Sequence, residues 1–395
     1  MVVCLSRASD LIFPPESCMP LTPEIRWIDT PEALNEACAE VAEADVIALD
    51  TEFFREKTFH PVPALVQFCV GGAAYLVDPT VVACTDAFRR LLGEGPVKLL
   101  HASSEDLEVF LHWAGVTVSP LVDTQIAQAL LGEVPAMGYQ KLVEFWVGET
   151  LPKDETRSNW LERPLSETQT TYAALDVIYL LEVWQAQRDA LERYGRLGWL
   201  EEECRKLVEQ AARDEHSDGQ WYLRQRQLWR LSPRQIEAYR RLTIWREGEV
   251  RRRDLPRGWL VSDKLLYGIA ERMPENRYEL AGVEGMKPPL VKREGDTLLA
   301  LVREARHVEE AHLPTPPWSP MEPAFKKRYK ALKKVVSREA EALGMAPEVL
   351  LRRRDLEALV SASLRGEPLP MPDGWRGERL AEALETVLHE TSETS

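Results

Sequence analysis

Two carboxylates stand two residues apart at the end of a short apolar run. Residues 46–53 read VIALDTEF, which is too short for an ordinary helix and rich in strand-forming residues, so it predicts a buried strand. Strand side chains alternate between faces, so Asp50 and Glu52 project to the same side. Two such charges disfavour each other's ionisation without a cation, and hard oxygen ligands suit Mg²⁺ or Mn²⁺. An isolated Asp-x-Glu is more often two solvated surface acids at a strand end, so the rest of the chain must decide.

A third acid, Asp106, follows the sequence HASSE. The pattern Ser103-x-x-Asp106 resembles a capping box directly before an apolar run, and it predicts that Asp106 lies in the first turn of a helix over about residues 104–114. An acid at this position is also stabilised by the helix dipole and needs no ligand. Asp106 alone therefore does not distinguish a metal site from an ordinary helix terminus.

A fourth acid, Asp176, falls within a long predicted helix that runs from Gln169 to about residue 193. Ser166-x-x-Gln169 is a capping-box candidate for its start. The helical spacing places Asp176 inside the apolar stripe that should pack on the sheet. An unpaired buried carboxylate is costly, so Asp176 needs a partner such as a metal ion. Tyr172 lies one helical turn earlier, on the same face of the helix as Asp176. Without Asp176, we would interpret Tyr172 as a core tyrosine.

The elements that must position these residues alternate between strands and helices from about residue 25. Two strand-like runs are separated by Gly71-Gly72, which predicts a hairpin beside the strand of Asp50 and at least partly antiparallel pairing. The alternation predicts an α/β fold with helices on the faces of the sheet. The expected strands are 46–53, 64–70, 74–78, 97–101 and 121–123, and the expected helices are 30–43, 84–92, 104–114 and 169–193.

The order and spacing of these residues resemble the three motifs of the DEDD 3′→5′ exonucleases, and the tyrosine before the last aspartate identifies the subclass. The flanking sequence is similar to the ribonuclease D family over about residues 25–200. The resemblance implies a ribonuclease H-like exonuclease domain with a mixed sheet flanked by helices. It is carried by Asp50-Thr51-Glu52-Phe53, Leu65-Val66-Gln67, Asp106, Asp123-Thr124-Gln125-Ile126-Ala127, Asn159-Trp160-Leu161-Glu162-Arg163-Pro164-Leu165-Ser166 and Tyr172-Ala173-Ala174-Leu175-Asp176.

The resemblance also implies a two-metal mechanism with Mg²⁺ or Mn²⁺ ions roughly 4 Å apart. One ion would deprotonate the attacking water, and the other would stabilise the departing 3′ oxygen. Tyr172 would orient the water, because a reference pKa near 10 makes it a poor base at neutral pH. Asp123 also ends a strand, but we assign it a structural role because the family's metal positions are already filled. Those positions, called the four acids below, are Asp50, Glu52, Asp106 and Asp176.

Charge is distributed unevenly along the chain, whose net charge is −15. Residues 1–200 hold 14 Lys and Arg against 30 Asp and Glu, whereas residues 201–395 hold 35 against 34. The acidic half cannot hold a polyanion by bulk charge and needs metal ions or local basic residues. Basic clusters occur in the second half at 251–253, 326–334 and 352–354. These clusters are either solvated helix faces or a binding surface for RNA. Alternatively, the helical second half of the chain only packs against the first half.

Beyond residue 200 the pattern becomes all-helical. Ser232-Pro233-Arg234-Gln235 combines an N-cap, a helix-starting proline and a capping glutamine. The region resembles an HRDC domain, and a diverged second copy is expected after a proline-rich linker. The expected division is an N-terminal extension (1–24), the exonuclease domain (25–200), a connecting helix and linker (201–224), HRDC domain 1 (225–308), the linker (309–320) and HRDC-like domain 2 (321–390).

The remaining composition favours a cytoplasmic enzyme. The six cysteines form no CxxC pair, so we expect free thiols in a reducing compartment and no zinc finger. No secretory leader and no apolar stretch of about 18 residues are evident. We expect a monomer without membrane contact.

The resemblance implies an enzyme that trims RNA 3′ ends, such as those of tRNA precursors, and releases nucleoside 5′-monophosphates. DNA remains an alternative substrate, since recognition of the 2′-OH depends on local geometry. A nucleic-acid-binding adaptor with a decayed site is a second alternative, disfavoured because the four acids and Tyr172 are all present.

Overall fold

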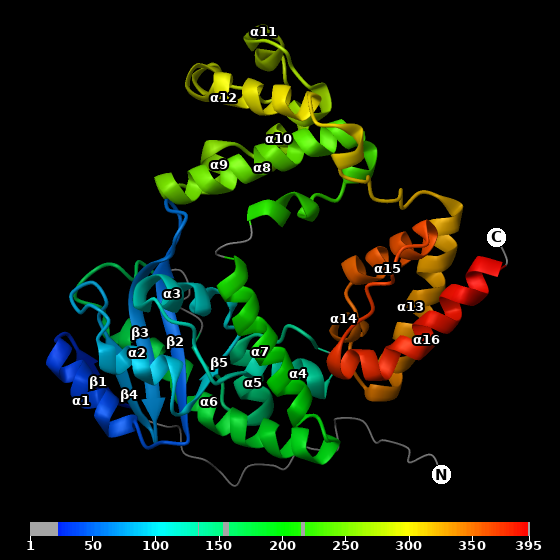
Figure 1. Cartoon of the computed structure of the whole chain (residues 1–395). Helices are drawn as coiled ribbons and strands as arrows, with labels where there is room; N and C mark the ends of the chain where they lie inside the picture. Colours follow the sequence, from blue (N-terminus) through cyan, green and yellow to red (C-terminus); the bar gives the residue numbers. More distant parts are fainter. Residues whose placement is uncertain (1–22, 133, 153–157, 215–217, 394–395) are drawn as a thin grey trace.

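The computed structural model describes residues 23–132, 134–152, 158–214 and 218–393, and Figure 1 shows three lobes. One lobe contains the sheet, and the other two are helical. Residues 1–22 of the expected N-terminal extension lie outside the described part. The α/β pattern starts at Glu24, close to the expected residue 25.

The sheet has six strands in the order β1-β4-β3-β2-β5-β6. The predicted hairpin is confirmed: β3 and β4 are antiparallel, β2 is antiparallel to β3, and β5 and β6 extend the sheet in parallel. The edge strand β1, parallel to β4, was not predicted. The strands are β1 (Glu24–Ile28), β2 (Val46–Phe54), β3 (Val62–Val70), β4 (Ala73–Val77), β5 (Val97–Leu100) and β6 (Leu121–Asp123).

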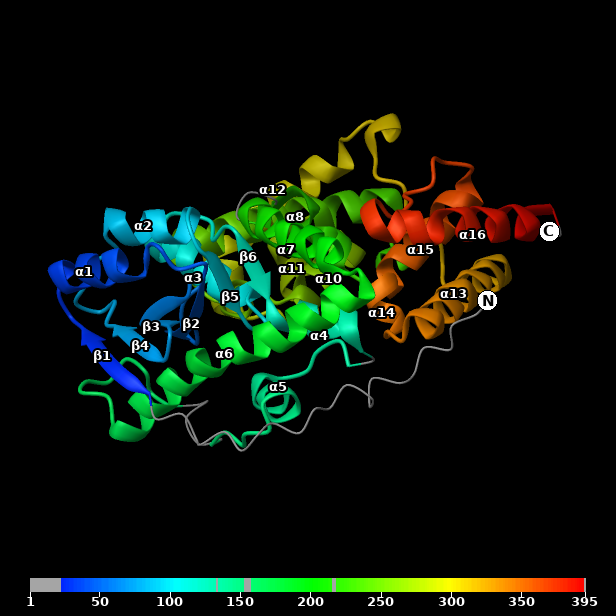
Figure 2. The ribbon, with the colours of Figure 1, turned by 90° about the horizontal axis from the view of Figure 1, so that it is seen from below.

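Helices cover both faces of the sheet, as Figure 2 shows. One face packs against α1 (Pro31–Val41), α2 (Asp86–Gly93) and α3 (Ser104–Ala114), and the other against α5 (Tyr139–Trp146) and α6 (Glu167–Tyr194). Helix α4 (Thr124–Leu131) follows β6 and contacts α6. In β2, Leu49 joins the core on the α1–α3 side, whereas Ala48 joins the core on the α6 side. Strand alternation therefore directs Asp50 and Glu52 toward α6, and Thr51 toward α3.

The capping boxes predicted at Ser166 and Ser103 have different outcomes. At α6, the Gln169 backbone N–H donates to the Ser166 hydroxyl at 3.1 Å, and the Ser166 backbone N–H donates to the Gln169 side chain at 2.9 Å, so this box is confirmed. The box at Ser103 was wrong. Its backbone is not extended, as a capping residue normally is, and its hydroxyl donates to Asp123 instead. Asp106 nevertheless lies in the first turn of α3, as predicted.

The first helical lobe has its own hydrophobic core, joined by Phe59 from the β2–β3 connection. This connection reaches the end of α8 (Figure 1). The predicted start of α8 at the Ser232 and Gln235 capping box is confirmed. The elements of this lobe are η2 (Asp218–Arg224), η3 (Leu228–Arg230), α8 (Pro233–Arg253), α9 (Arg257–Leu260), α10 (Asp263–Arg272), α11 (Arg277–Ala281) and α12 (Pro288–Arg306).

The second helical lobe shares a continuous core with the sheet-containing lobe. Helix α7 (Leu197–Asp214) joins them, because the Trp199 and Trp375 rings stack at 4.4 Å. The Arg196 guanidinium also donates to the Leu343 carbonyl at 2.8 Å. Part of the chain's second half thus packs against its first half. The elements are η4 (Glu310–His312), α13 (Pro323–Leu343), α14 (Pro347–Leu350), α15 (Arg353–Arg365) and α16 (Gly374–Glu393).

Two further expectations concern membranes and thiols. Within the described ranges, no helix has the length and apolarity required to span a bilayer. Four cysteines in these ranges, at positions 38, 69, 84 and 204, are buried free thiols, as predicted. Cys4 and Cys18 lie outside the described residues.

Candidate active site

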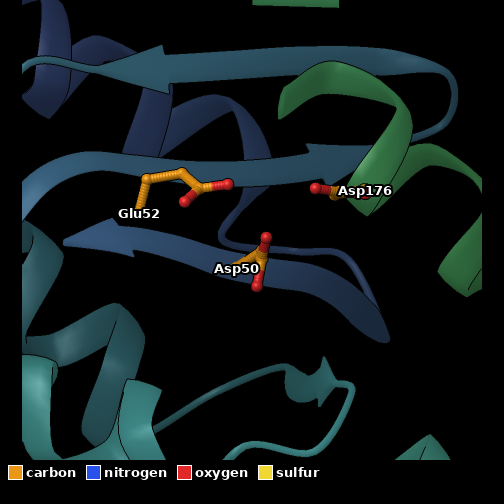
Figure 3. A group of neighbouring side chains, drawn as sticks. All are labelled: Asp50, Glu52 and Asp176. Atoms are coloured by element: carbon orange, nitrogen blue, oxygen red, sulfur yellow. The ribbon is translucent and has the colours of Figure 1, made fainter. Parts of the chain in front are cut away.

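Three carboxylates converge where β2 passes under α6. Asp50 and Glu52 extend from β2 and Asp176 from α6, and Figure 3 shows them facing a common space. Each offers a carboxylate oxygen, and these oxygens lie within 4.8 Å of one another. The structure therefore brings together three of the four acids in an arrangement that can hold a cation.

The start of α6 is fixed on the sheet by Arg163. Its guanidinium donates to both carboxylate oxygens of Asp78, at 2.6 and 2.8 Å, and to the Ala64 carbonyl at 2.6 Å. Asp78 follows directly after β4 and is buried. A bidentate pair of this kind has a defined geometry, so it sets where α6 begins and hence where its aspartate meets β2.

The fourth acid, Asp106, approaches the end of β2 from the opposite face of the sheet. It is buried in the first turn of α3 and accepts a hydrogen bond of 2.5 Å from the Thr51 hydroxyl. Thr51 lies between Asp50 and Glu52, so its side chain points to the α3 side. Asp106 shares a cavity wall with the other acids but stands outside the three-carboxylate group.

Burial raises the pKa of each of the four acids when no cation is present, and mutual repulsion adds to this effect at Asp50 and Glu52. The pKa of Asp50 is raised well above its usual range by burial and by the charges of Asp106, Asp176 and Glu52. Burial is also the main cause that raises the pKa of Glu52 to about 9, of Asp176 to about 8 and of Asp106 to about 6. A bound cation would favour the ionised forms.

Tyr172 lies one helical turn before Asp176 and is hydrogen-bonded to it. Its ring is half-buried and lies 6.1 Å from the ring of Trp160, centroid to centroid. Burial and the charge of Asp176 raise the pKa of the Tyr172 hydroxyl above its usual value. The hydroxyl is therefore neutral at ordinary pH and can orient a neighbouring group through hydrogen bonds.

One buried polar side chain beside the acids lacks a partner among the described residues. Gln67 is opposite Asp50 in the β2–β3 register, is completely buried, and has no hydrogen bond at either amide atom. His101, in the wall of the same cavity, is half-buried and its Nδ1 lies 3.0 Å from the Thr124 hydroxyl. Buried polar atoms without partners are costly. Together with an all-carboxylate donor set, these unpartnered atoms fit a hydrated divalent cation.

The surrounding cavity of about 570 Å³ contains residues that the sequence did not indicate. Tyr139 lines it and donates from its hydroxyl to the Leu175 carbonyl at 2.9 Å, and its ring lies 5.6 Å from that of His101. Lys141 supplies the single Lys or Arg side chain of the wall within the described part of the chain. Neither residue belongs to a motif that the sequence analysis used, so no signal pointed to them.

Asp123 makes the structural contacts expected of it. Its carboxylate accepts from the backbone N–H groups of Gln125 and Ile126 at the start of α4. It also accepts from the backbone N–H and hydroxyl of Ser103, both at 2.8 Å. Asp123 therefore fixes the start of α4 and the turn before α3, which carries Asp106.

Comparisons with known proteins agree with this geometry. A model of the 3′-5′ exonuclease family matches residues 25–192, and the HRDC domain model matches residues 235–302. Ribonuclease D of Pseudomonas paraeruginosa (strain DSM 24068 / PA7) is 42% identical over 372 residues, which cover 93% of this chain and 98% of that protein. Ribonuclease D of Escherichia coli (strain K12) is 36% identical over 371 residues, which cover 92% and 98%.

A solved structure gives the same result over nearly the whole chain. The crystal structure of Escherichia coli RNase D, described as an exoribonuclease involved in structured RNA processing, superposes with a TM-score of 0.84 at 34% identity. The match covers 93% of this chain and 99% of that one. The catalytic core of RRP6 from Trypanosoma brucei, at 21% identity and a TM-score of 0.52, shares the fold. The chain belongs to the ribonuclease D family and is a hydrolytic 3′→5′ exoribonuclease with an HRDC domain.

Proposed function

We propose that the four acids hold two divalent metal ions, Mg²⁺ or Mn²⁺, at which the 3′-terminal phosphodiester of RNA is hydrolysed. The supporting observation is the convergence of Asp50, Glu52 and Asp176 within 4.8 Å, with Asp106 approaching from the other face of the sheet. When bound, the ions would supply Lewis-acid activation of water and stabilisation of the departing 3′ oxygen.

The protein's own side chains would neutralise charge and orient the reacting groups. The four carboxylates would hold the two divalent ions and offset their charge. Tyr172, held by its hydrogen bond with Asp176, would orient the attacking water rather than remove its proton, because its pKa lies above the usual value. The ammonium group of Lys141 places one positive charge at the cavity wall, where it would reduce repulsion between the acids and the RNA.

We propose structured RNA with a free 3′ end as the substrate, such as a tRNA precursor, with release of nucleoside 5′-monophosphates. Support comes from similarity over nearly the full length to the Escherichia coli enzyme, which is described as acting in structured RNA processing. The buried free thiols of the described residues are compatible with the cytoplasm.

We further propose that the HRDC domain spans 225–308 and that 321–390 is a diverged second copy, with the protein acting as a monomer. Support for the second copy is its helical composition after a proline-containing connection.

Matched RNA and DNA oligonucleotides labelled at the 3′ end, incubated with Mg²⁺ or Mn²⁺, test this function. We expect nucleoside 5′-monophosphates from RNA, a dependence on added metal, and no release by the Asp176→Asn variant. Equal rates on DNA would favour the DNA alternative. Binding of RNA without hydrolysis under any metal condition would favour the adaptor alternative.

A further inference from the structure

Helix α13 of the second helical lobe carries a long run of basic residues. Between positions 326 and 338 it contains seven Lys or Arg and no Asp or Glu. Its buried side chains include Phe325, Leu332 and Val336, which form the apolar face. Arg328 is also buried and donates to the Ser363 hydroxyl at 2.7 Å. The other basic side chains are exposed, at positions 326, 327, 330, 333, 334 and 338.

Four of these exposed lysines follow the spacing of one helical face, because they stand at i, i+4, i+7 and i+8. They are Lys326, Lys330, Lys333 and Lys334, and we call them the lysine face. Within the described ranges, their ammonium groups form no ion pair or hydrogen bond. The lysine face therefore presents four positive charges that no described side chain neutralises.

Basic residues at other helix ends are paired within their own helices. At the end of α8, Arg252 and Arg253 bond to Glu249 at 2.6 and 2.5 Å. At the start of α15, Arg353 bonds to Glu357 at 2.7 Å. Such pairs stabilise a helix, whereas like charges three or four residues apart destabilise it. The lysine face keeps this repulsion, which a bound polyanion would relieve.

The lysine face has a fixed place relative to the active site. Leu332 and Val336, on the opposite side of α13, belong to the hydrophobic core that continues into the sheet-containing lobe. The Leu343 carbonyl at the end of α13 also accepts from Arg196. Helix α13 lies in a different lobe from the four acids (Figure 1), and none of its described residues line their cavity. RNA that contacts both places must therefore extend beyond the nucleotides that enter the cavity.

The chemistry of the lysine face fits a phosphate backbone. Lysine ammonium groups are compact charges on flexible stems, and contacts to phosphates carry no sequence information. Lys326 and Lys334 are eight residues apart, which is about 12 Å along a helix. A row of charges of this length can contact several phosphates of one RNA whatever its sequence.

We propose that the lysine face binds the phosphate backbone of the folded part of an RNA whose 3′ end occupies the active site. This inference rests on the structured RNA proposed above as substrate. The lysine face supplies, in a second lobe, the positive charge for a polyanion that the acidic first half of the chain lacks.

The test combines Lys326→Gln, Lys330→Gln and Lys333→Gln in the full-length chain that carries Asp50→Asn, which stops hydrolysis. Binding of a tRNA-sized stem-loop RNA with a free 3′ end should weaken about tenfold. The slope of log K against log salt should flatten by about 0.9 for every phosphate that is no longer neutralised. Binding of oligouridine of about 6 nucleotides should change little, because it is too short to reach α13 from the cavity.

Folding does not confuse this test, because Gln and Lys have similar helix propensity. The triple variant should melt at or slightly above the temperature of its parent, since repulsion is removed. With native Asp50, it should show a higher KM for the stem-loop RNA and an unchanged rate on oligouridine.

The matched control removes three exposed charges from the first helical lobe, by Lys287→Gln, Lys292→Gln and Arg293→Gln. Its affinity for the stem-loop RNA should stay close to that of the parent. The inference is overturned if the lysine-face variant binds the stem-loop RNA with the parent's affinity and salt slope, or if the control weakens binding equally. If the chain with native residues hydrolyses oligouridine but not the stem-loop RNA, the proposed substrate fails instead.

Discussion

Buried carboxylates have different surroundings in the sheet-containing lobe and in the first helical lobe. The active-site cavity gathers the four acids and contains Lys141 as the single basic side chain of its described wall. In the first helical lobe, the fully buried Glu247 of α8 lies 3.1, 3.8 and 2.9 Å from the guanidiniums of Arg246, Arg251 and Arg257. The difference indicates that the chain itself neutralises Glu247, whereas the active-site acids need added cations.

Removing one metal-binding carboxylate should have the largest effect. Asp50→Asn or Asp176→Asn removes negative charge with little change in volume, so hydrolysis should fall by about 10³-fold or more. Folding and RNA affinity should remain close to native, because the substitution changes the side-chain volume little. Steady-state hydrolysis and RNA binding measure the two effects separately.

Glu105→Gln is the control for this prediction, since Glu105 lines the same cavity but is not one of the four acids. It should keep most of the activity. Activity within a few-fold of native for Asp50→Asn would contradict the metal assignment.

Deleting the Tyr172 hydroxyl should have the next largest effect. Tyr172→Phe keeps the ring that packs near Trp160 and should lower kcat by about 10²-fold, with KM little changed. A variant that loses thermal stability and keeps its kcat would show instead that Tyr172 is only a core residue.

Stability should respond to pH and metal through the four acids. Their pKa values in the folded state are raised, to about 9 for Glu52 and about 8 for Asp176, whereas carboxyls in an unfolded chain titrate near 4. The unfolded chain therefore releases these protons first, so the metal-free protein should lose stability as pH rises from about 4 to about 9. Mg²⁺ or Mn²⁺ should raise the melting temperature by more near pH 8.5 than near pH 6.

Glu52→Gln provides the comparison for this effect. Without metal near pH 9, it should melt several degrees above the native chain, because it removes one repelling charge. It should also lose most of the gain on adding metal. Equal metal-induced shifts for the native chain and Glu52→Gln at both pH values would contradict this account.

Much of the sheet could be predicted from the sequence because local patterns specify it. The apolar run before Asp50 and the Gly71-Gly72 turn with its positive φ angles predicted β2 and the hairpin. The regular helical spacing likewise predicted that Asp176 faces the sheet. The short edge strand β1 was missed because only its last residue is fully buried, so the strand lacks a clear alternating pattern.

The rest depends on contacts between distant residues. Gln67 has the same sequence signal as any residue of a strand, and only the register opposite Asp50 places it beside the acids. The Ser103 capping box failed because Asp123, distant in sequence, binds the hydroxyl. The stacking of Trp199 on Trp375 likewise has no local signal.

Counting the bound metal ions tests the central claim most directly. Mn²⁺ would be titrated into the full-length chain in the presence of RNA with a non-hydrolysable 3′ linkage, and the bound ions counted by calorimetry. We expect two ions for the native chain and one for Asp106→Asn, because the three-carboxylate group remains intact in that variant. Saturation of the native chain by a single ion, or two ions bound by Asp106→Asn, would contradict the two-metal account.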